Sequence, residues 1–344
     1  MNLRMKTILA AACLLLAYQP ASASVFDNLY QVRIEVSARD PATLEQAFRD
    51  AMAIILTRVT GTRQIEQSEE IEETLASARD YMQQFGFIDS RTLLISFDGQ
   101  AINRKLSELG QPVWGQERPA TLIWLVLTDE RGRRQILAAE DLGSVADLLK
   151  ETASQRGVPV IIPLMDTEDQ SAIDVSDLRG AFEENIFAAS ERYDADAILV
   201  GTARIGRRTG EDEPVYRVSW TLYFAGQVQS WRGDLTAGVD GAADEFAGIL
   251  AAIDIQNSGR QLVLVRGVGD LIAYGRVSQY LESLSLVNSI TVDRVHGDDV
   301  LFGLDLRADP DRLASAIKLG KVLFLEDADY SALTPGTMVY RYRQ

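Results

Sequence analysis

The segment LVGTARIGRRTG, Leu199–Gly210, places two glycines five residues apart directly after an apolar run. Glycines at this spacing form phosphate-binding loops when Lys-Ser/Thr follows the second glycine and a helix begins there. In this chain Arg207 and Arg208 occupy those two positions, and a turn pattern and then a strand pattern follow. Because no helix N-terminus is expected to receive an anion, we interpret Gly201 and Gly206 as parts of a strand that ends at a turn.

A second glycine pair, Gly267 and Gly269, lies between an expected strand and an expected helix, as the loop of a dinucleotide site does. The third glycine position of that motif holds Ile272. Asp293 stands where the acidic ribose ligand would be, but its strand leads into an antiparallel hairpin. The pattern therefore predicts a glycine turn that leads into a helix, and not a nucleotide site.

His296 is the only histidine of the chain, and Cys13 is the only cysteine. A Ser-His-Asp arrangement would have to use His296, yet its surroundings, VHGDD, are typical of a hairpin turn, and no Gly-x-Ser-x-Gly elbow accompanies it. One histidine is too few for a histidine-based zinc site. We therefore expect no catalytic residue of this kind, no cofactor and no metal ligand.

The acidic segment DTEDQSAIDVSD, Asp166–Asp177, carries oxygen ligands near the positions that a calcium loop requires. Position six needs a sharp turn and holds Ser171, and position twelve holds aspartate instead of glutamate. We interpret the segment as a solvated loop that caps the helix after it, with calcium binding as the alternative. The ligands of that alternative would be Asp166, Glu168, Gln170 and Asp174.

Paired carboxylates and tryptophans are the remaining candidates for chemistry. The chain has 50 acidic residues, so many pairs lie close by chance, and a glycosidase-like dyad stays open. Trp124, Trp220 and Trp231 lie on expected strands, which favours core or cross-strand packing. Trp114 lies in a linker and is the best candidate for an exposed contact.

The first residues, MNLRMKTILAAACLLLAYQPASAS, have the three-part pattern of a secretory signal peptide. The apolar run is shorter than the roughly 20 residues that span a bilayer, and small residues precede an expected cleavage between Ala23 and Ser24. We therefore expect a periplasmic mature chain. A retained membrane anchor, or a lipoprotein lipidated at Cys13, is the alternative.

The chain carries a net charge of −16, and loss of the signal peptide would bring it to −18. A surface of that charge repels nucleic acids and anionic lipid headgroups. We therefore expect no nucleic-acid partner and no stable membrane insertion of the mature chain. After such a cleavage no cysteine remains, which excludes disulfides and thiolate nucleophiles from the mature chain.

Hydropathy patterns predict an architecture of the α/β and α+β classes in several units. These units are a signal peptide (1–23), an N-terminal α+β unit (24–115), a mixed-sheet α/β sandwich domain (116–257), a ferredoxin-like β-α-β-β-α-β domain (258–330) and a C-terminal tail (331–344). The tail alternates between apolar and polar residues, and we expect it to add an edge strand.

Several expected elements can be compared directly with the structure. In the N-terminal unit, Asp40 and Asp98 are expected to cap helices, and a further helix is expected over 68–84. In the middle unit we expect a buried strand over 158–166, helices over 175–193 and 241–253, and a tight hairpin turn at Ala225-Gly226.

Four segments of the mature chain resemble a bacterial envelope family known only as domain-of-unknown-function family 2066. They are LYQVRIEV…AFRDAMAIILTRVTG, PVWGQERPATLIWLVLTDERGRRQIL, GVPVIIPLMDTED and ASERYDADAILVGTARI…VSWTLYFAGQVQSW. The resemblance implies an exported protein with no assigned activity and no known catalytic residues. YDADAILVGTARI and the two strands after it are also similar to α/β domains of periplasmic assembly factors. Those are the amino-terminal domain of the TolB protein and the lipoprotein activators of peptidoglycan synthases, which work by protein contact.

These observations predict an exported, non-catalytic protein that binds or assembles unidentified proteins of the cell envelope. The alternative is a hydrolase that acts on an envelope polymer with a pair of carboxylates, and a third reading is a small-ligand sensor built on the ferredoxin-like unit. Whether the protein is an enzyme stays open, as does its oligomeric state.

Overall fold

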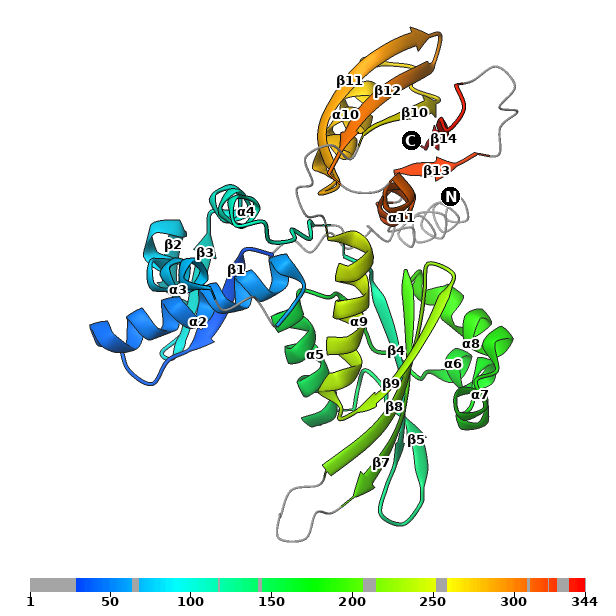
Figure 1. Ribbon diagram of the computed structural model, residues 1–344. Coiled ribbons are helices and arrows are strands. Elements are labelled where there is room, and N and C mark those ends of the chain that lie inside the picture. The colour runs from blue at the N-terminus through cyan, green and yellow to red at the C-terminus, as the bar shows by residue number, and fades with distance from the viewer. Residues whose placement is uncertain are drawn as a thin grey trace, which may run out of the picture.

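The computed structural model describes residues 29–63, 68–116, 118–141, 144–206, 215–251, 259–307, 310–320, 322–326 and 334–343. The expected signal peptide, with its cleavage point at Ala23 and Ser24, lies outside these residues, as do Cys13, Arg207 and Arg208. Within the described parts the strands form three sheets with helices packed against them, so the chain has the mixed α/β fold that the sequence predicts (Figure 1).

The N-terminal unit is a three-stranded antiparallel sheet in the order β1-β3-β2 with helices beside it. Its elements are β1 (Gln31–Glu35), α2 (Pro41–Thr60), α3 (Glu69–Ala76), β2 (Met82–Phe87), β3 (Thr92–Phe97) and α4 (Gly99–Glu108). The side chain of Asp40 accepts hydrogen bonds from the first backbone N–H groups of α2, and Asp98 does the same for α4. Both expected caps are confirmed.

The helix expected over 68–84 is wrong in its second half. The helix α3 ends at Ala76, a short 3-10 helix follows at Ala78–Tyr81, and the chain then enters β2. A bulge between Met82 and Gln84 interrupts the pairing of β2 with β3. The extra residue breaks the alternation by which a strand is recognised.

The central unit has a mixed sheet in the order β5-β4-β7-β8-β9, with β6 beside the start of β4. Its elements are β4 (Thr121–Thr128), β5 (Arg134–Ile136), α5 (Ser144–Arg156), β6 (Val160–Ile161), α6 (Thr167–Ala172), α7 (Val175–Gly180), α8 (Glu183–Ser190), β7 (Ala197–Gly206), β8 (Val215–Phe224), β9 (Gln227–Gly233) and α9 (Thr236–Leu250). The helices α5 and α9 lie on one side of the sheet and α6–α8 on the other (Figure 1). The expected hairpin turn is confirmed, because Ala225 and Gly226 both have positive φ.

Two expected elements of the central unit are shorter than predicted. The buried strand over 158–166 is reduced to the two residues of β6, which pair with the first residues of β4. The helix over 175–193 is divided into α7 and α8, because the chain turns at Ala181, whose φ is 53°. That left-handed conformation is costly for a residue other than glycine and ends the helix.

The helix α9 begins at Thr236, five residues before the expected start at 241. Its glycines allow close packing against the β8–β9 hairpin. A Cβ atom on Gly238 would lie 2.5 Å from the ring of Trp220, and one on Gly241 would lie 2.5 Å from the ring of Trp231. The absence of side chains at these two glycines therefore leaves room for the indole rings, although glycine generally destabilises a helix.

The C-terminal unit follows the element order of the predicted ferredoxin-like domain, and the tail adds a strand. Its elements are β10 (Arg260–Arg266), α10 (Leu271–Ser283), β11 (Val287–His296), β12 (Asp299–Leu306), α11 (Pro310–Leu319), β13 (Leu323–Leu325) and β14 (Met338–Tyr342). The strand order is β11-β12-β10-β14-β13, so β14 lies inside the sheet and not at the expected edge. The reason is burial: Val339 and Tyr340 are almost fully buried, and a strand paired on both sides satisfies their backbone groups.

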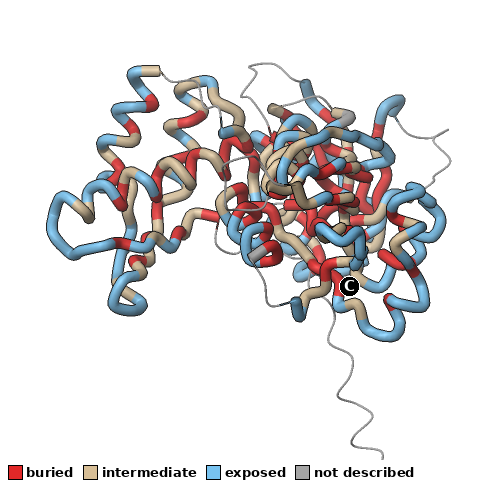
Figure 2. The backbone as a smooth tube through the Cα atoms, turned by 90° about the horizontal axis from the view of Figure 1, so that it is seen from below, coloured by how far each residue is buried: buried red, intermediate tan, exposed pale blue. Residues whose placement is uncertain are grey.

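Buried stretches, red in Figure 2, run through the interior of the units, while most loops are exposed. Three buried arginines, Arg58, Arg118 and Arg156, lie where the N-terminal unit meets the central unit. Arg58 on α2 donates a hydrogen bond of 2.7 Å from Nε to the carbonyl oxygen of Ser154 on α5. None of the helices in the described parts combines the length and hydropathy needed to cross a bilayer.

Candidate functional site

The first glycine pair is structural, as predicted. Gly201 and Gly206 both belong to β7, and a Cβ atom on Gly201 would lie 2.4 Å from the ring of Trp220. The absence of a side chain at Gly201 therefore makes room for an indole ring rather than for a phosphate.

The second glycine pair and the single histidine also lie at turns. Gly267 has a φ of 82°, and the next N–H, of Val268, donates to the carbonyl oxygen of Asp298. The N-terminus of α10 is capped by Asp270, whose carboxylate accepts from the N–H of Ala273. His296 ends β11 at the hairpin to β12. Asp293, at the position of the acidic ribose ligand in a dinucleotide site, forms an ion pair with Arg260.

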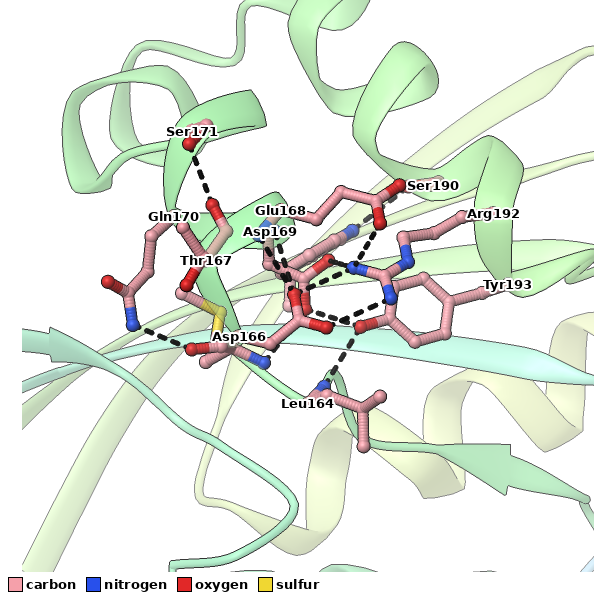
Figure 3. Close-up of polar contacts among 12 residues, drawn as sticks. Leu164, Asp166, Thr167, Glu168, Asp169, Gln170, Ser171, Ser190, Arg192 and Tyr193 are labelled. Atoms are coloured by element: carbon pink, nitrogen blue, oxygen red, sulfur yellow. Dashed lines mark hydrogen bonds and ion pairs between the residues drawn. The ribbon is translucent and has the colours of Figure 1, made fainter.

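The acidic segment is a network of ion pairs and not an open loop (Figure 3). Asp166 caps α6 and accepts a hydrogen bond of 2.8 Å from Nη1 of Arg192. Asp169 is fully buried, and its Oδ2 accepts from the Tyr193 hydroxyl at 2.5 Å and from the Met165 N–H at 2.8 Å. The prediction of a solvated loop is wrong at Asp169, because these donors replace water.

The other half of that prediction is confirmed, since Asp174 caps α7 through a reciprocal pair of hydrogen bonds with Asp177. Ser171, at the turn position of a calcium loop, lies within α6 and donates to the carbonyl oxygen of Thr167. Among the described residues no three His, Cys, Asp or Glu side chains are arranged to hold a metal ion.

The electrostatics of this network favour ionised carboxylates. The hydrogen bond from Arg192 lowers the pKa of Asp166 to about 2. Burial, followed by the hydrogen bond to Asp169, raises the pKa of Tyr193 to about 12. The other carboxyl groups with resolved shifts in the described parts also have a lowered pKa, namely Asp40, Glu70, Asp89, Asp129, Asp174, Asp234 and Glu326. A general acid needs a raised pKa, so these groups give the hydrolase alternative no support.

Trp114 is not the exposed contact that its linker position predicts. Its side chain is almost fully buried and packs against Phe246 of α9, with ring centroids 6.3 Å apart. The guanidinium of Arg118 lies over the indole, 3.6 Å from its centroid. Trp124 and Trp220 are fully buried and Trp231 pairs with Trp220 across β8 and β9, which confirms the packing predicted for these three.

A polar cleft of about 790 Å³ lies between the N-terminal sheet and the end of α10. Tyr30 in its wall donates a hydrogen bond of 2.8 Å to Asn103 Oδ1. Two carboxylates line the cleft from opposite units, Asp98 and Glu282. Asp98 already accepts two N–H groups of α4 as its cap. The arrangement is that of a polar gap between units rather than of an acid and base facing one bond.

A more distinctive surface lies on the central sheet, beyond the area that α6–α8 cover. Alternate side chains of a strand point to the same face of the sheet. Trp124 of β4 and Val200 of β7 are covered by α6–α8. The later residues at even spacing from them, such as Thr128 and Arg204, therefore lie on the same face. Register joins Thr128 to Arg134 and to Arg204, and joins Arg204 to Arg217. In the next row Ser219 faces Arg232. We call this surface the open sheet face, formed by Thr128, Arg134, Thr202, Arg204, Arg217, Ser219, Thr221, Val228, Ser230 and Arg232.

The four arginines of the open sheet face are all exposed. Within the parts of the chain that the structure describes, none of their guanidinium groups has an ion-pair or hydrogen-bond partner. Thr221 and Ser230 form a hydrogen bond of 3.0 Å between their hydroxyls. The face therefore presents guanidinium and hydroxyl groups to solvent.

The open sheet face has an apolar end and a free edge. Val228 on β9 is 53% exposed and stands opposite Tyr223, against which Phe187 of α8 packs edge-on. β9 is the last strand on its side of the described sheet, and its pairing is with β8. An edge strand presents unpaired N–H and C=O groups that can template another strand.

Sequence reasoning missed this site because its arginines come from four strands. The chain separates Arg134 from Arg232 by almost a hundred residues, and only the sheet register brings them together. The local signal was an arginine at an outward position of an alternating strand, which by itself is typical of any solvated sheet.

Comparison with family models gives a match to the N-terminal part of the chain. Residues 23–115 match the model described as "Domain of unknown function (DUF8605)". The resemblance to domain-of-unknown-function family 2066 is therefore wrong, since the match is to a different family and covers the N-terminal unit. No curated protein matches the sequence.

Solved structures give distant likenesses. One is a PelC dodecamer from Paraburkholderia phytofirmans, with a TM-score of 0.17 and 15% identity over 40% of this chain and 89% of that chain. Another is a protein of the competence-damaged protein (CinA) superfamily from Escherichia coli, with a TM-score of 0.20 and 17% identity over 43% of this chain and 83% of that chain. TM-scores this low do not inform on function.

Proposed function

We propose that the protein is a non-catalytic binding protein of the bacterial cell envelope that engages another protein through the open sheet face. The observation that carries this proposal is the free edge of β9 beside an exposed apolar side chain, Val228, and four exposed arginines. A free strand edge presents unpaired backbone N–H and C=O groups that a strand of a protein partner can pair.

The chemistry of the described residues supports binding over hydrolysis. The strongest ionisable network, around Asp166, Asp169 and Arg192, is satisfied internally and holds α6 against the 3-10 helix Glu191–Tyr193 that follows α8. A fully paired carboxylate is poorly suited to proton transfer. The hydrolase alternative would require a pair of carboxylates with a raised pKa, and no observation favours it.

Export to the periplasm is the second part of the proposal and rests on the N-terminal sequence pattern. Cell fractionation followed by mass spectrometry of the purified chain tests it. We expect the protein in the periplasmic fraction with Ser24 as its first residue. A cytoplasmic chain that retains its N-terminus would contradict the export proposal, and an N-terminus at a lipidated Cys13 would indicate a lipoprotein.

Site-specific photo-cross-linking in the native cells tests the binding role. A photo-reactive amino acid replaces Val228 in one variant and Ser90, at the β2–β3 turn, in the control. We expect the probe at position 228 to capture one or two envelope proteins that the probe at position 90 does not. If both positions capture the same background set, or position 228 captures nothing, the proposed function is wrong.

A further inference from the structure

The arginines of the open sheet face are arranged at a cost to the fold. Arg204 and Arg217 are directly opposite each other on β7 and β8. Side chains in such positions have Cβ atoms roughly 5 Å apart, and like charges there are destabilising. The chain has 50 acidic residues, yet among those described none forms an ion pair with these two arginines. The face is thus a concentration of positive charge on an acidic protein.

The free edge of β9 can be assigned residue by residue. Phe224 and Gln227 flank the two-residue turn, so they exchange both backbone hydrogen bonds, and hydrogen-bonded pairs then recur at every second position. The N–H and C=O groups of Val228, Ser230 and Arg232 consequently point away from β8. These are the same β9 residues whose side chains lie on the open sheet face.

We propose that an extended acidic segment of a partner protein adds to the edge of β9 as a further strand, with carboxylates directed toward Arg232 and Arg217. This inference rests on the proposed function and names the chemistry of the partner. Alternate side chains of an added strand point to one face of the sheet, so acidic residues at every second position would face the arginines. Guanidinium groups pair with carboxylates through two parallel hydrogen bonds.

The charge around β9 also sets the direction of the acidic pattern along the added strand. At the turn end, Val228 is apolar, and Glu183 of α8 lies near Tyr223, whose pKa is raised by burial and then by the charge of Glu183. A carboxylate at this end would meet a like charge. At the other end Arg232 and Arg217 offer positive charge. The partner segment is therefore apolar opposite Val228 and acidic opposite Arg232.

A protein segment fits this surface better than a membrane of anionic lipid. A bilayer would use the guanidinium groups but leave the outward backbone groups of β9 unpaired. The net charge of −16 also opposes approach to an extended anionic surface, whereas a short peptide brings few charges and can pair them all.

Fluorescence anisotropy with a synthetic peptide tests the inference on the full chain. The peptide has about ten residues, enough to match a strand, with threonine at alternate positions, glutamate between them in one half and valine in the other. We expect it to bind the wild-type chain and to bind the variant R217Q/R232Q about tenfold more weakly, equivalent to ~1.4 kcal/mol. The matched control R91Q/R104Q removes two exposed arginines of the N-terminal unit and should bind like the wild type.

A second pair of variants tests strand addition itself. Ser230→Pro removes an N–H that points outward and leaves the bonds to β8 in place, so we expect it to abolish peptide binding. Ser230→Ala loses the same hydroxyl contact to Thr221 and should bind normally. Circular dichroism establishes that both variants are folded, and if the proline variant is unfolded, Ser230→N-methylalanine introduced by chemical ligation replaces it.

Four outcomes would overturn the inference. They are equal binding of a peptide with lysine in place of glutamate, equal binding by the proline and alanine variants, arginine-dependent binding of phosphatidylglycerol vesicles without peptide binding, and no peptide binding at all. In each case the photo-cross-link at position 228 still reports separately on the proposed function. A captured partner together with a failed peptide test would leave the binding role standing and reject the acidic strand.

Discussion

Arg156, at the end of α5, donates a hydrogen bond of 2.8 Å from Nη2 to the backbone carbonyl of Gly61, at the end of α2. The same guanidinium forms ion pairs with Asp240 and Asp244 of α9. One almost fully buried side chain therefore joins the N-terminal unit to two helices of the central unit. This junction holds the N-terminal unit against the α5–α9 side of the central sheet and away from the open sheet face (Figure 1).

Substitution Arg156→Ala should destabilise the chain by about 2 kcal/mol, because a buried carbonyl loses its donor, Asp244 loses its ion pair with Arg156, and Asp240 keeps only its ion pair with Arg63. Asp240 and Asp244 are partly exposed and regain water, which keeps the loss below that of a fully buried pair. Urea unfolding measures the change. The control Arg133→Ala breaks an exposed ion pair with Asp129 and should cost less than ~1 kcal/mol; equal losses for the two variants would contradict the assignment.

Substitution Trp114→Ala should cost about 3–5 kcal/mol, the range for removing a large buried aromatic side chain. The indole fills the space between Phe246 and Arg118, and its loss leaves a cavity in the junction. Trp114→Phe keeps part of that packing and should lose clearly less. Thermal unfolding compares the two variants. A loss within ~0.5 kcal/mol for Trp114→Ala is the result expected of a surface residue, and it would support the exposed position that the linker sequence suggested.

The ion pair between Asp166 and Arg192 predicts a specific acid response. The pKa of Asp166 is lowered to about 2 in the folded chain, so its contribution is present above the unfolded value near 4 and is lost as the pH falls toward 2. We expect Asp166→Asn to be less stable than the wild type at neutral pH and to lose stability less steeply between pH ~4 and ~2. Urea unfolding across this pH range measures both slopes.

The control for the acid response is Glu35→Gln, on an exposed position of β1. It removes a carboxylate without removing an ion pair of the described residues. Its slope against pH should follow that of the wild type. If the free energy of unfolding of Asp166→Asn falls with pH as steeply as that of the wild type, the hydrogen bonds from Arg192 do not stabilise the fold.

Features set by neighbouring residues could be predicted from the sequence. Asp40 and Asp98 cap the helices that directly follow them, and Ala225-Gly226 forms the turn between two adjacent strands. In each case the residues that make the hydrogen bonds lie within a few positions of one another, so local pattern and local structure agree.

Features that depend on distant partners could not be predicted in this way. Trp114 is buried by Phe246, which lies far along the chain, and the glycines of α9 are explained by the indole rings of β8 and β9. The position of β14 within the sheet, between β10 and β13, is set by pairing with strands that lie elsewhere in the sequence. The open sheet face requires the register of neighbouring strands, because a slip of one residue would turn Arg204 or Arg217 to the other face.

Removing the like-charge pair of the open sheet face should stabilise the protein. Because Arg204 and Arg217 are directly opposite without an acidic partner in the described residues, the variant R204Q/R217Q should gain about 0.2–1 kcal/mol at low salt. The gain should shrink at high salt, which screens the repulsion. The control R91Q/R104Q removes the same charge from positions outside the face, and on a chain of net charge −16 it should gain nothing. Urea unfolding at two salt concentrations measures the stability of all three chains. If R204Q/R217Q is less stable than the wild type, these arginines stabilise the fold, and the prediction of a destabilising like-charge pair is wrong.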